Sequence, residues 1–457
     1  MVYKNYYNVT EWQAGDPYKD IGEVINSMIA DIKSRQTDAD IHEGGKPGAV
    51  IYIPPGDYHL TTQVLIDISY LKIVGSGHGF ISSSIRFNLP ESEWADCHEL
   101  WPGGSRILVD LPPAADNREE TGAAFLVSRS GSPRISSVEF ANFCIDGIHF
   151  LDDGSGETNP ENTYTNGKTG IYVASAQDSF RITGMGMVYL EHGITIYHAD
   201  ALNIHDNFIA ECGSCIELRD WGQASKVSDN ILGAGYKGYS IYAQNFGGLL
   251  VTANNIFPRG AASICFSGVA RSSITGNRIH SFYPGMLVLQ ENCLENLISS
   301  NHFLCDPEPW PPMQTHDNGL DVQYGLLHIS GSYNSVIANH FSIILDARCI
   351  MQSEAVPVII RVALGKGNYI SSNYTAASAK TMKESDVESG SCFSMQVEAL
   401  LTAEKSKSVA VTTVCVEQKS QQNIVLDSGS DAEVVIDKKA NAFRATPLPE
   451  IAQQAVV

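Results

Sequence analysis

The sequence contains no run of eighteen apolar residues, so no segment reads as a membrane-spanning helix. The N-terminal stretch MVYKNYYNVTEW also lacks the apolar core of a signal peptide. We therefore expect a cytoplasmic protein, the alternative being a secreted protein whose leader has been removed. Hydrophobic residues make up 43% of the chain and charged residues 18%, which indicates a globular protein and excludes a disordered one.

Positive charge is scarce in this chain. Its 30 lysine and arginine residues face 51 aspartate and glutamate residues, which gives a formal net charge of −21. A surface of this sign repels phosphate backbones, anionic membranes and acidic polymers, so we expect no nucleic-acid partner, no membrane partner and no pectin-like substrate. A neutral ligand such as a sugar is compatible with it.

Motifs for nucleotide, metal and redox chemistry are also missing. The sequence has no P-loop, no H-E-x-x-H, no Rossmann glycine fingerprint and no kinase signature. Its ten cysteines are scattered, which indicates reduced thiols packed as small apolar residues. The C-x-x-C from Cys212 to Cys215 lacks the second ligand pair of a zinc site and the βαβ context of a redox motif. We expect no metal and no organic cofactor.

One segment near the N-terminus has the pattern of an amphipathic helix. In DIGEVINSMIADI, apolar residues recur at helical spacing from Ile21 to Ile32. Asp20 can cap this helix, with Glu23 three residues later. The following GAVIYIPPGDYHL predicts a short strand, a turn and a return strand, and short β segments with Gly, Asn, Asp and Ser at their corners continue from there.

The middle of the chain carries an internal repeat of 22 to 25 residues. Each repeat has an asparagine followed closely by an apolar residue: Asn207, Asn230, Asn255, Asn277 and Asn301. The pattern extends to Gly184-Met185 upstream and to Asn339 and Asn373 downstream. Each interval holds about three short strands with their corners, which is the length of one turn of a parallel β-helix.

Columns of like residues support this interpretation. Positions two apart on a strand share a face, and two apolar columns are expected to point inward: Ile194, Ile216, Ile241, Ile264 and Leu287, and Ile196, Leu218, Ala243, Phe266 and Leu289. The column between them would point outward: Thr195, Glu217, Tyr242, Cys265 and Val288. We predict an all-β protein, a right-handed single-stranded parallel β-helix with an N-terminal capping helix. A β-sandwich with chance spacing is the alternative.

The repeat suggests four parts. Residues 1–45 would form an N-terminal extension whose helix covers the open end of the solenoid, and residues 46–373 the β-helix itself. Residues 374–424 are polar, mixed in charge and free of the asparagine corner, so we expect an insertion there, either an active-site lid or a partly ordered excursion. Residues 425–457 would form the last coil and the C-terminal tail.

The segment NIHDNFIAECGSCIELRDW, residues 203–221, contains four carboxylates. Asp206 directly precedes the corner residue Asn207, and Glu217 follows eleven residues later in the outward column, so both are expected to flank one corner of one coil. Cleaving a glycosidic bond needs one protonated carboxyl to release the leaving oxygen and one ionised carboxylate as base or nucleophile. The alternative is the ordinary polar face of an acidic protein.

Four further residues are candidates for substrate binding. His192 and Glu211 lie within one coil of the two acids and could bind sugar hydroxyls. Arg259 follows an asparagine corner on a neighbouring coil and could point toward a substrate or a carboxylate. Tyr283 could stack on a sugar ring. Each also has an ordinary interpretation as a structural histidine, a surface ion pair or an interface residue.

A family resemblance is carried by seven longer segments: GEVINSMIADIKSRQT, GGKPGAVIYIPPGDY, NGKTGIYVAS, ITGMGMVYLEHG, DNFIAECGSCIEL, LLVTANNIFPRG and FYPGML. They resemble the inulin fructotransferase family, over about residues 8 to 345. This group includes enzymes that form difructose anhydride III from inulin and hydrolases that open that anhydride to inulobiose. The resemblance implies a right-handed parallel β-helix assembled as a homotrimer, with active sites near subunit interfaces.

The resemblance also implies site residues. The family's two essential carboxylates are an Asp and a Glu in a D-N-x-I-A-E-C-G-x-C-x-E motif, which falls on Asp206 and Glu217. We expect Glu217 as general acid on the bridging oxygen and Asp206 as base or nucleophile at the anomeric carbon. The absent leader and the long insertion, whose lid would suit a small closed substrate, favour the hydrolase over the fructotransferase. A catalytically silent carbohydrate-binding β-helix of the tail-spike kind is the third hypothesis.

Overall fold

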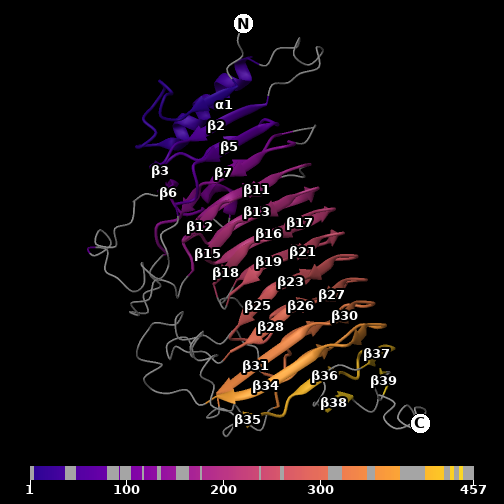
Figure 1. The fold of residues 1–457 in the computed structure, drawn as a ribbon. Helices are drawn as coiled ribbons and strands as arrows, with labels where there is room; N and C mark the ends of the chain where they lie inside the picture. The colour runs from indigo at the N-terminus through magenta and orange to yellow at the C-terminus, as the bar shows by residue number, and fades with distance from the viewer. Residues whose placement is uncertain are drawn as a thin grey trace, which may run out of the picture. The chain divides into compact units, whose positions relative to one another are not determined.

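The protein is seen here as a computed structural model (Figure 1). It describes residues 5–35, 48–79, 92, 104–115, 118–130, 135–150, 164–174, 178–235, 238–257, 262–306, 322–346, 356–380, 407–426, 433–436 and 442–445. The chain forms two compact units. Unit 1 comprises residues 1–250 and 254–260, and unit 2 comprises residues 251–253 and 261–457.

Unit 1 contains helix α1 (Ile21–Arg35), the short 3₁₀ helix η2 (Glu119–Gly122) and strands of three parallel sheets, named A, B and C here. Sheet A contains, in order, β1 (Tyr6–Asn8), β2 (Ala49–Ile53), β5 (Leu71–Gly75), β8 (Glu139–Ala141), β11 (Arg181–Thr183), β14 (Asn203–His205) and β17 (Lys226–Ser228). Sheet B contains β3 (Gly56–Leu60), β6 (Ser105–Val109), β9 (Cys144–Asp146), β12 (Gly186–Val188), β15 (Phe208–Cys212), β18 (Ile231–Ala234) and β22 (Asn255–Ile256). Sheet C contains β4 (Val64–Ile66), β7 (Ala123–Val127), β10 (Thr169–Val173), β13 (His192–Asp200), β16 (Ser214–Gln223) and β19 (Tyr239–Gln244), and β20 (Phe246–Gly247) pairs with β16.

Unit 2 repeats the arrangement without a helix among its described residues. Its sheet A strands are β24 (Ser273–Thr275), β27 (Leu297–Ser299), β30 (Ser335–Ile337), β33 (Tyr369–Ser371), β37 (Asn423–Leu426) and β39 (Ala442–Ala445). Its sheet B strands are β25 (Arg278–Ser281), β28 (His302–Cys305), β31 (His340–Asp346), β34 (Tyr374–Lys380) and the antiparallel β35 (Lys407–Ser408). Its sheet C strands are β23 (Ala262–Ser267), β26 (Leu287–Leu289), β29 (Leu327–Ile329), β32 (Val358–Val362), β36 (Thr412–Val416) and β38 (Glu433–Ile436). Strand β21 (Leu250–Thr252) belongs to sheet A and contains residues of both units.

In both units the chain passes from sheet A to B to C and then returns to A one coil later (Figure 1). Each strand therefore pairs in parallel with the equivalent strand of the next coil. Connections between parallel strands of one sheet are right-handed, so the chain winds as a right-handed parallel β-helix. The predicted fold class is confirmed, and the β-sandwich alternative is excluded.

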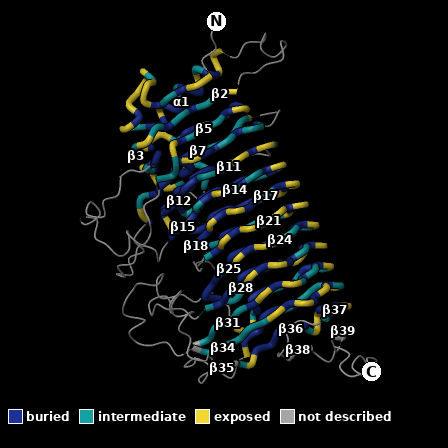
Figure 2. Tube along the Cα trace, viewed as in Figure 1, coloured by how far each residue is buried: buried dark blue, intermediate teal, exposed yellow. Residues whose placement is uncertain are grey.

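The inward columns are confirmed within each unit. Ile194 pairs with Ile216 and Ile216 with Ile241, and all three are fully buried. Along each coil, buried residues alternate with more exposed ones, as Figure 2 shows. The outward column differs from a solvated face, because Thr195 and Glu217 are buried although they point away from the core. Something outside sheet C must therefore cover them.

Asparagine side chains stack at the corner between sheets A and B. In unit 1, Asn207 Nδ2 donates to Asn230 Oδ1, and Asn230 Nδ2 donates to Asn254 Oδ1, both at 2.9 Å. The ladder residue is thus Asn254, and the predicted corner at Asn255 is wrong by one position, since Asn255 is exposed and belongs to β22. Unit 2 continues the pattern through Asn277, Asn301, Asn339 and Asn373, and has a second ladder through Asn296, Asn334, Asn368 and Asn423.

Helix α1 packs against β2, β3 and β4, the first strands of unit 1, as expected for a capping helix. Its predicted apolar face is buried. Asp20 Oδ1 accepts hydrogen bonds from the Gly22 N–H at 3.0 Å and the Glu23 N–H at 3.4 Å, which confirms the N-cap. The same oxygen accepts the Thr61 and Thr62 N–H groups at 3.2 Å, so the cap also fastens the helix to the turn after β3.

Both ends of the segment expected as an insertion, 374–424, belong to coils. Strand β34 pairs with β31, and β36 pairs with β32. Asn423 continues the second asparagine ladder, so the last coils begin well before residue 425. Residues 381–406, which include the centre of the expected lid, lie outside the described residues. In the described part of the chain, no helix is long and apolar enough to cross a membrane.

Candidate active site

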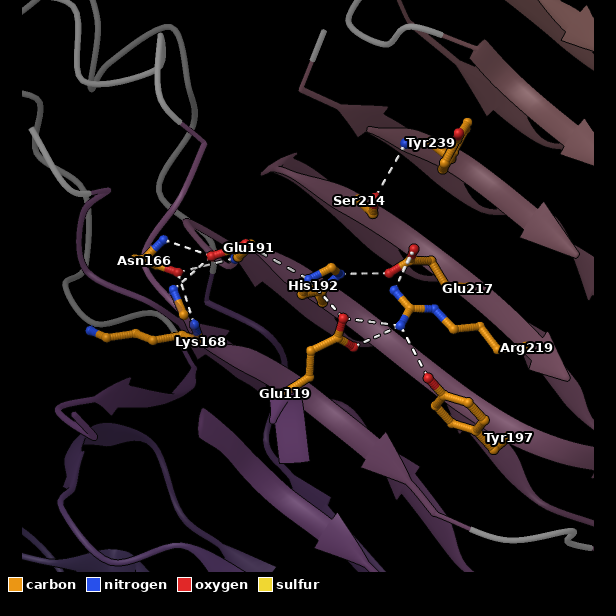
Figure 3. A network of polar contacts seen from close by, with 11 residues as sticks. Glu119, Asn166, Lys168, Glu191, His192, Tyr197, Ser214, Glu217, Arg219 and Tyr239 are labelled. Atoms are coloured by element: carbon orange, nitrogen blue, oxygen red, sulfur yellow. Dashed lines mark hydrogen bonds and ion pairs between the residues drawn. The ribbon is translucent and has the colours of Figure 1, made fainter. Parts of the chain in front are cut away.

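The candidate site lies on the outer face of sheet C in unit 1. Strand β16 is ten residues long and pairs with β13 so that Glu217 lies opposite Thr195 and Arg219 opposite Tyr197. Because side chains alternate along a strand, Glu217 and Arg219 both point outward. Glu119, from η2, reaches this face from a segment about a hundred residues earlier, as its contacts with Arg219 show (Figure 3).

Glu217 is held by two basic side chains. His192 Nδ1 lies 2.6 Å from Glu217 Oε2, and Arg219 Nη2 donates to Glu217 Oε1 at 2.9 Å (Figure 3). The Glu217 side chain is only 6% exposed, so little water competes for these bonds. A buried carboxylate is tolerable only when it is paired and hydrogen-bonded in this way.

Glu119 completes the cluster from the other side. Its carboxylate accepts two hydrogen bonds from Arg219 Nη1, at 2.8 and 3.0 Å, and lies 3.7 Å from His192 Nε2. Arg219 Nη1 also donates to the Tyr197 hydroxyl at 3.2 Å. Glu119 therefore contacts both residues that hold Glu217, and it covers part of the column that the sequence predicted to point outward.

The backbone beneath His192 is fixed by a second polar group. Glu191 Oε2 accepts hydrogen bonds from the Asn166 and Gly167 N–H groups, at 3.0 and 2.7 Å (Figure 3). Asn166 Oδ1 in turn accepts the Glu191 N–H at 3.1 Å. Lys168 Nζ is buried here and donates to two backbone carbonyls, those of Val109 and Gly147. These bonds connect successive coils and limit the movement of the imidazole.

The charges in the cluster set the protonation of its members. Burial alone would raise the pKa of Glu217, but the hydrogen bonds and positive charges of His192 and Arg219 outweigh burial and lower that pKa. Burial alone would lower the pKa of His192, but the hydrogen bond and negative charge of Glu217 raise it above its ordinary value. Glu217 is therefore ionised in this geometry. This lowered pKa favours the ionised role, base or nucleophile, over the general-acid role first expected for Glu217.

Asp206 lies at a different corner from Glu217. It sits in the left-handed region, with φ of 57°, at the turn between β14 and β15, and its side chain is 64% exposed. His205 Nδ1 lies 2.7 Å from Asp206 Oδ2. Glu217 comes only after strand β15 and the next corner. The expectation that both acids flank one corner is wrong, because a full strand of sheet B lies between them.

The length of β15 decides whether one chain can bring the acids together. Its five residues span about 16 Å at roughly 3.3 Å per residue. Glycosidases place their two carboxyl groups about 5 to 9.5 Å apart. Asp206 at one end of β15 and Glu217 on the outer face of sheet C beyond its other end do not form such a pair within one coil.

Of the four residues predicted to bind substrate, the structure brings His192 into contact with Glu217. Glu211 is buried near the end of β15, with φ of 53°. Tyr283 is buried in unit 2, just after β25. Arg259 lies outside the described residues.

Two residues of the cluster were missed by sequence reasoning. Arg219 could have been found, because it lies two residues after Glu217 on the same strand and so shares its face. Glu119 gives no such signal, since it lies outside the repeat and reaches the cluster only through the fold.

The two cysteines of the C-x-x-C motif are packed inside the coil that carries Glu217. Cys212 and Cys215 are free and buried, and burial raises the pKa of both thiols, so they remain protonated and unreactive. Among the residues that the structure describes, no group of three or more His, Cys, Asp or Glu side chains is arranged to hold a metal ion.

Comparison with known proteins gives two family models and several relatives. The model described as "Beta helix repeat of Inulin fructotransferase" matches residues 300–447, and that of "Periplasmic copper-binding protein (NosD)" matches residues 121–308. The DFA-I-forming inulin fructotransferase of Arthrobacter globiformis is 44% identical over 386 residues, which cover 82% of this chain and 90% of that protein.

Solved structures of the DFA-IIIase of Arthrobacter chlorophenolicus A6 are also similar. Its complex with DFA-III is 64% identical, covers 97% of this chain and 99% of that one, and has a TM-score of 0.90. Its complex with GF2 is 65% identical, with 97% and 100% coverage and a TM-score of 0.89. That enzyme has also been solved without its lid.

Proposed function

The chain belongs to the inulin fructotransferase family, and within it we propose that the protein hydrolyses difructose anhydride III to inulobiose. The observation that carries this proposal is the identity of 64 to 65% over 97% of the chain with a DFA-IIIase solved with DFA-III and with GF2. The relative that forms difructose anhydride I is less similar, at 44%.

Chemically, the reaction opens one fructosyl linkage of the anhydride. A proton passes to the bridging oxygen, and the bond from that oxygen to the anomeric carbon breaks. Glu217, ionised between His192 and Arg219, takes a proton from the water whose oxygen bonds to that carbon. Asp206 with His205, 2.7 Å apart, supplies the proton to the leaving oxygen. This reverses the roles first expected for the two carboxylates.

The site is completed by a second copy of the chain. Asp206 and Glu217 lie at opposite ends of β15, and Asp206 is exposed. A rotationally symmetric oligomer repeats one heterologous contact around its axis, so Asp206 of one copy can meet Glu217 of its neighbour. We expect a homotrimer with one such site at each interface. The resemblance of the motif around Asp206 and Glu217 to the inulin fructotransferase family implies the same assembly.

The second candidate is inulin fructotransfer, in which a hydroxyl of the substrate replaces water as the acceptor. The observation that favours this second function is the 44% identity with the DFA-I-forming inulin fructotransferase of Arthrobacter globiformis. Incubation of the protein with difructose anhydride III and, separately, with inulin decides between the two. Inulobiose from the anhydride supports the hydrolase, whereas an anhydride released from inulin supports the transferase. Absence of product from both substrates would contradict both functions and leave a carbohydrate-binding role.

A further inference from the structure

A groove of about 390 Å³ lies on unit 2, and none of its lining residues belongs to the Glu217 cluster. Its walls come from β23, β26 and β29, from the residues that directly follow β26 and β29, and from the segment before β29. Its volume falls within the range of about 300 to 1,000 Å³ that small-molecule sites occupy. The groove is therefore large enough for a ligand of more than one sugar ring.

One wall of the groove is a stacked aromatic pair. The rings of Tyr324 and His328 are parallel within 10°, with centroids 4.0 Å apart. His328 Nδ1 lies 3.0 Å from the Tyr324 carbonyl oxygen, so Nδ1 carries the proton of the imidazole. Burial lowers the pKa of His328, which keeps the ring neutral. Nε2 is then an acceptor for a hydroxyl group.

The partner of that acceptor inside the protein is weak. Ser330 Oγ lies 3.4 Å from His328 Nε2, at the long end of the hydrogen-bonding range. A ligand hydroxyl that approaches this nitrogen can take its place, and Ser330 can then turn to the same ligand. The wall thus offers one acceptor and one hydroxyl side by side.

The rest of the groove suits an uncharged ligand. Gln290 and Glu291 stand exposed at the rim, and the buried Val288 forms an apolar part of the floor. Amide, hydroxyl and imidazole groups exchange hydrogen bonds with hydroxyl groups, and the apolar floor accepts the carbon face of a sugar ring. The chain's net charge of −21 disfavours anionic ligands.

We propose that this groove is an accessory site that binds a neutral fructose oligosaccharide without cleaving it. The identity of the sugar rests on the proposed function, whereas the existence of a site for a neutral carbohydrate rests on the groove alone. Such a site would hold a fructosyl chain on the protein surface and raise its local concentration.

The test uses the full-length protein carrying Glu217→Gln, titrated with GF2 by calorimetry. We expect two classes of binding site. Gln290→Ala, which changes an exposed side chain and leaves the fold intact, should weaken one class about tenfold, the effect of one or two lost hydrogen bonds. Adding His328→Ala should abolish that class. The matched control is His340→Ala, which replaces an exposed histidine of β31 outside the groove. It should leave the affinity of both classes of site for GF2 unchanged.

A single class of site that is unaffected by Gln290→Ala and His328→Ala would overturn the proposal. Loss of difructose anhydride III hydrolysis in the single variant Gln290→Ala, with Glu217 intact, would also overturn it, because the groove would then belong to the cleavage site. If the native protein hydrolyses no anhydride, the proposed function fails, but the calorimetric result still decides whether the groove binds the oligosaccharide.

Discussion

His192 Nδ1 meets Glu217 Oε2 at 2.6 Å, although the two residues belong to adjacent coils. The imidazole comes from the first residue of β13 and the carboxylate from the middle of β16, so the stacking of the coils creates the contact. Arg219 and Glu119 extend it into a chain of alternating charge. This arrangement keeps Glu217 ionised, and several testable consequences depend on that state.

Glu217→Gln should lower kcat for difructose anhydride III by about 10² to 10⁴-fold, because the amide cannot accept a proton from water. The fold should survive, since the amide oxygen can still accept a hydrogen bond from His192 or Arg219. Thermal unfolding and steady-state kinetics measure the two effects. Asp220→Asn, an exposed acid on the same strand, is the control and should keep its activity. Full activity in Glu217→Gln would remove Glu217 from the mechanism.

Two inactive variants should restore activity when they are combined. Co-refolding Asp206→Asn with Glu217→Gln gives some interfaces in which one copy supplies Asp206 and its neighbour supplies Glu217. With random mixing in equal amounts, about a quarter of the sites of a cyclic oligomer are intact. We therefore expect about a quarter of the native activity. If the mixture stays as inactive as each variant, both carboxylates of a working site come from one chain.

Glu119→Gln should weaken the hold on Arg219 and His192 without removing any group that touches the substrate. We expect about a tenfold lower kcat, since a small displacement of a catalytic carboxylate is costly, with little change in KM. The pH profile should shift as well, because His192 loses a nearby negative charge. Glu120→Gln changes the adjacent acid of η2 and should match the native enzyme. An unshifted pH profile in Glu119→Gln would indicate a purely structural residue.

The stability that the His192–Glu217 pair contributes should depend on pH. Because the pKa of His192 is raised, its contribution is complete below about pH 6.5 and is lost as the pH rises through the raised pKa. Because the pKa of Glu217 is lowered, its contribution is complete above about pH 4.5 and is lost as the pH falls through the lowered pKa. The Tm difference between native protein and His192→Gln should thus be greatest between these values. A difference that stays constant up to pH 9 would contradict the pairing.

Asn230→Ala should destabilise the β-helix, whereas Asn255→Ala should not. The side chain of Asn230 accepts a bond from Asn207 and donates to Asn254 and to the Ile204 carbonyl, all of them buried. Leaving such groups unpaired costs about 1 to 3 kcal/mol each, so a Tm loss of several degrees is expected. Asn255 is exposed and outside the ladder. Equal losses for both variants would refute the assignment of the ladder to Asn254.

The fold could be predicted from the sequence because the repeat records it directly. Every coil places its inward residues at the same positions, so Ile194, Ile216 and Ile241 align in the sequence as they do in sheet C. The error at Asn255 arose because two asparagines are adjacent, and the pattern cannot decide which one faces its neighbours. Only the hydrogen bonds identify Asn254.

The site was predicted less completely, for a geometric reason. Counting eleven residues from Asp206 to Glu217 does not reveal that strand β15 lies between them. The contact of Glu119 with Arg219 joins residues one hundred positions apart through a segment that follows no period. The ionised state of Glu217 depends on that contact network, and the sequence does not show which residues surround Glu217.

The second ladder shows how the architecture tolerates changes in length. Its members lie 38, 34 and 55 residues apart in sequence, yet each side-chain link measures 2.9 to 3.1 Å. The corner bonds therefore keep the turns that carry these four asparagines in register, whatever the length of chain between them. Protein engineers could exchange, shorten or graft the segments between these asparagines, and evolution could diversify substrate choice there, while the winding of the solenoid stays the same.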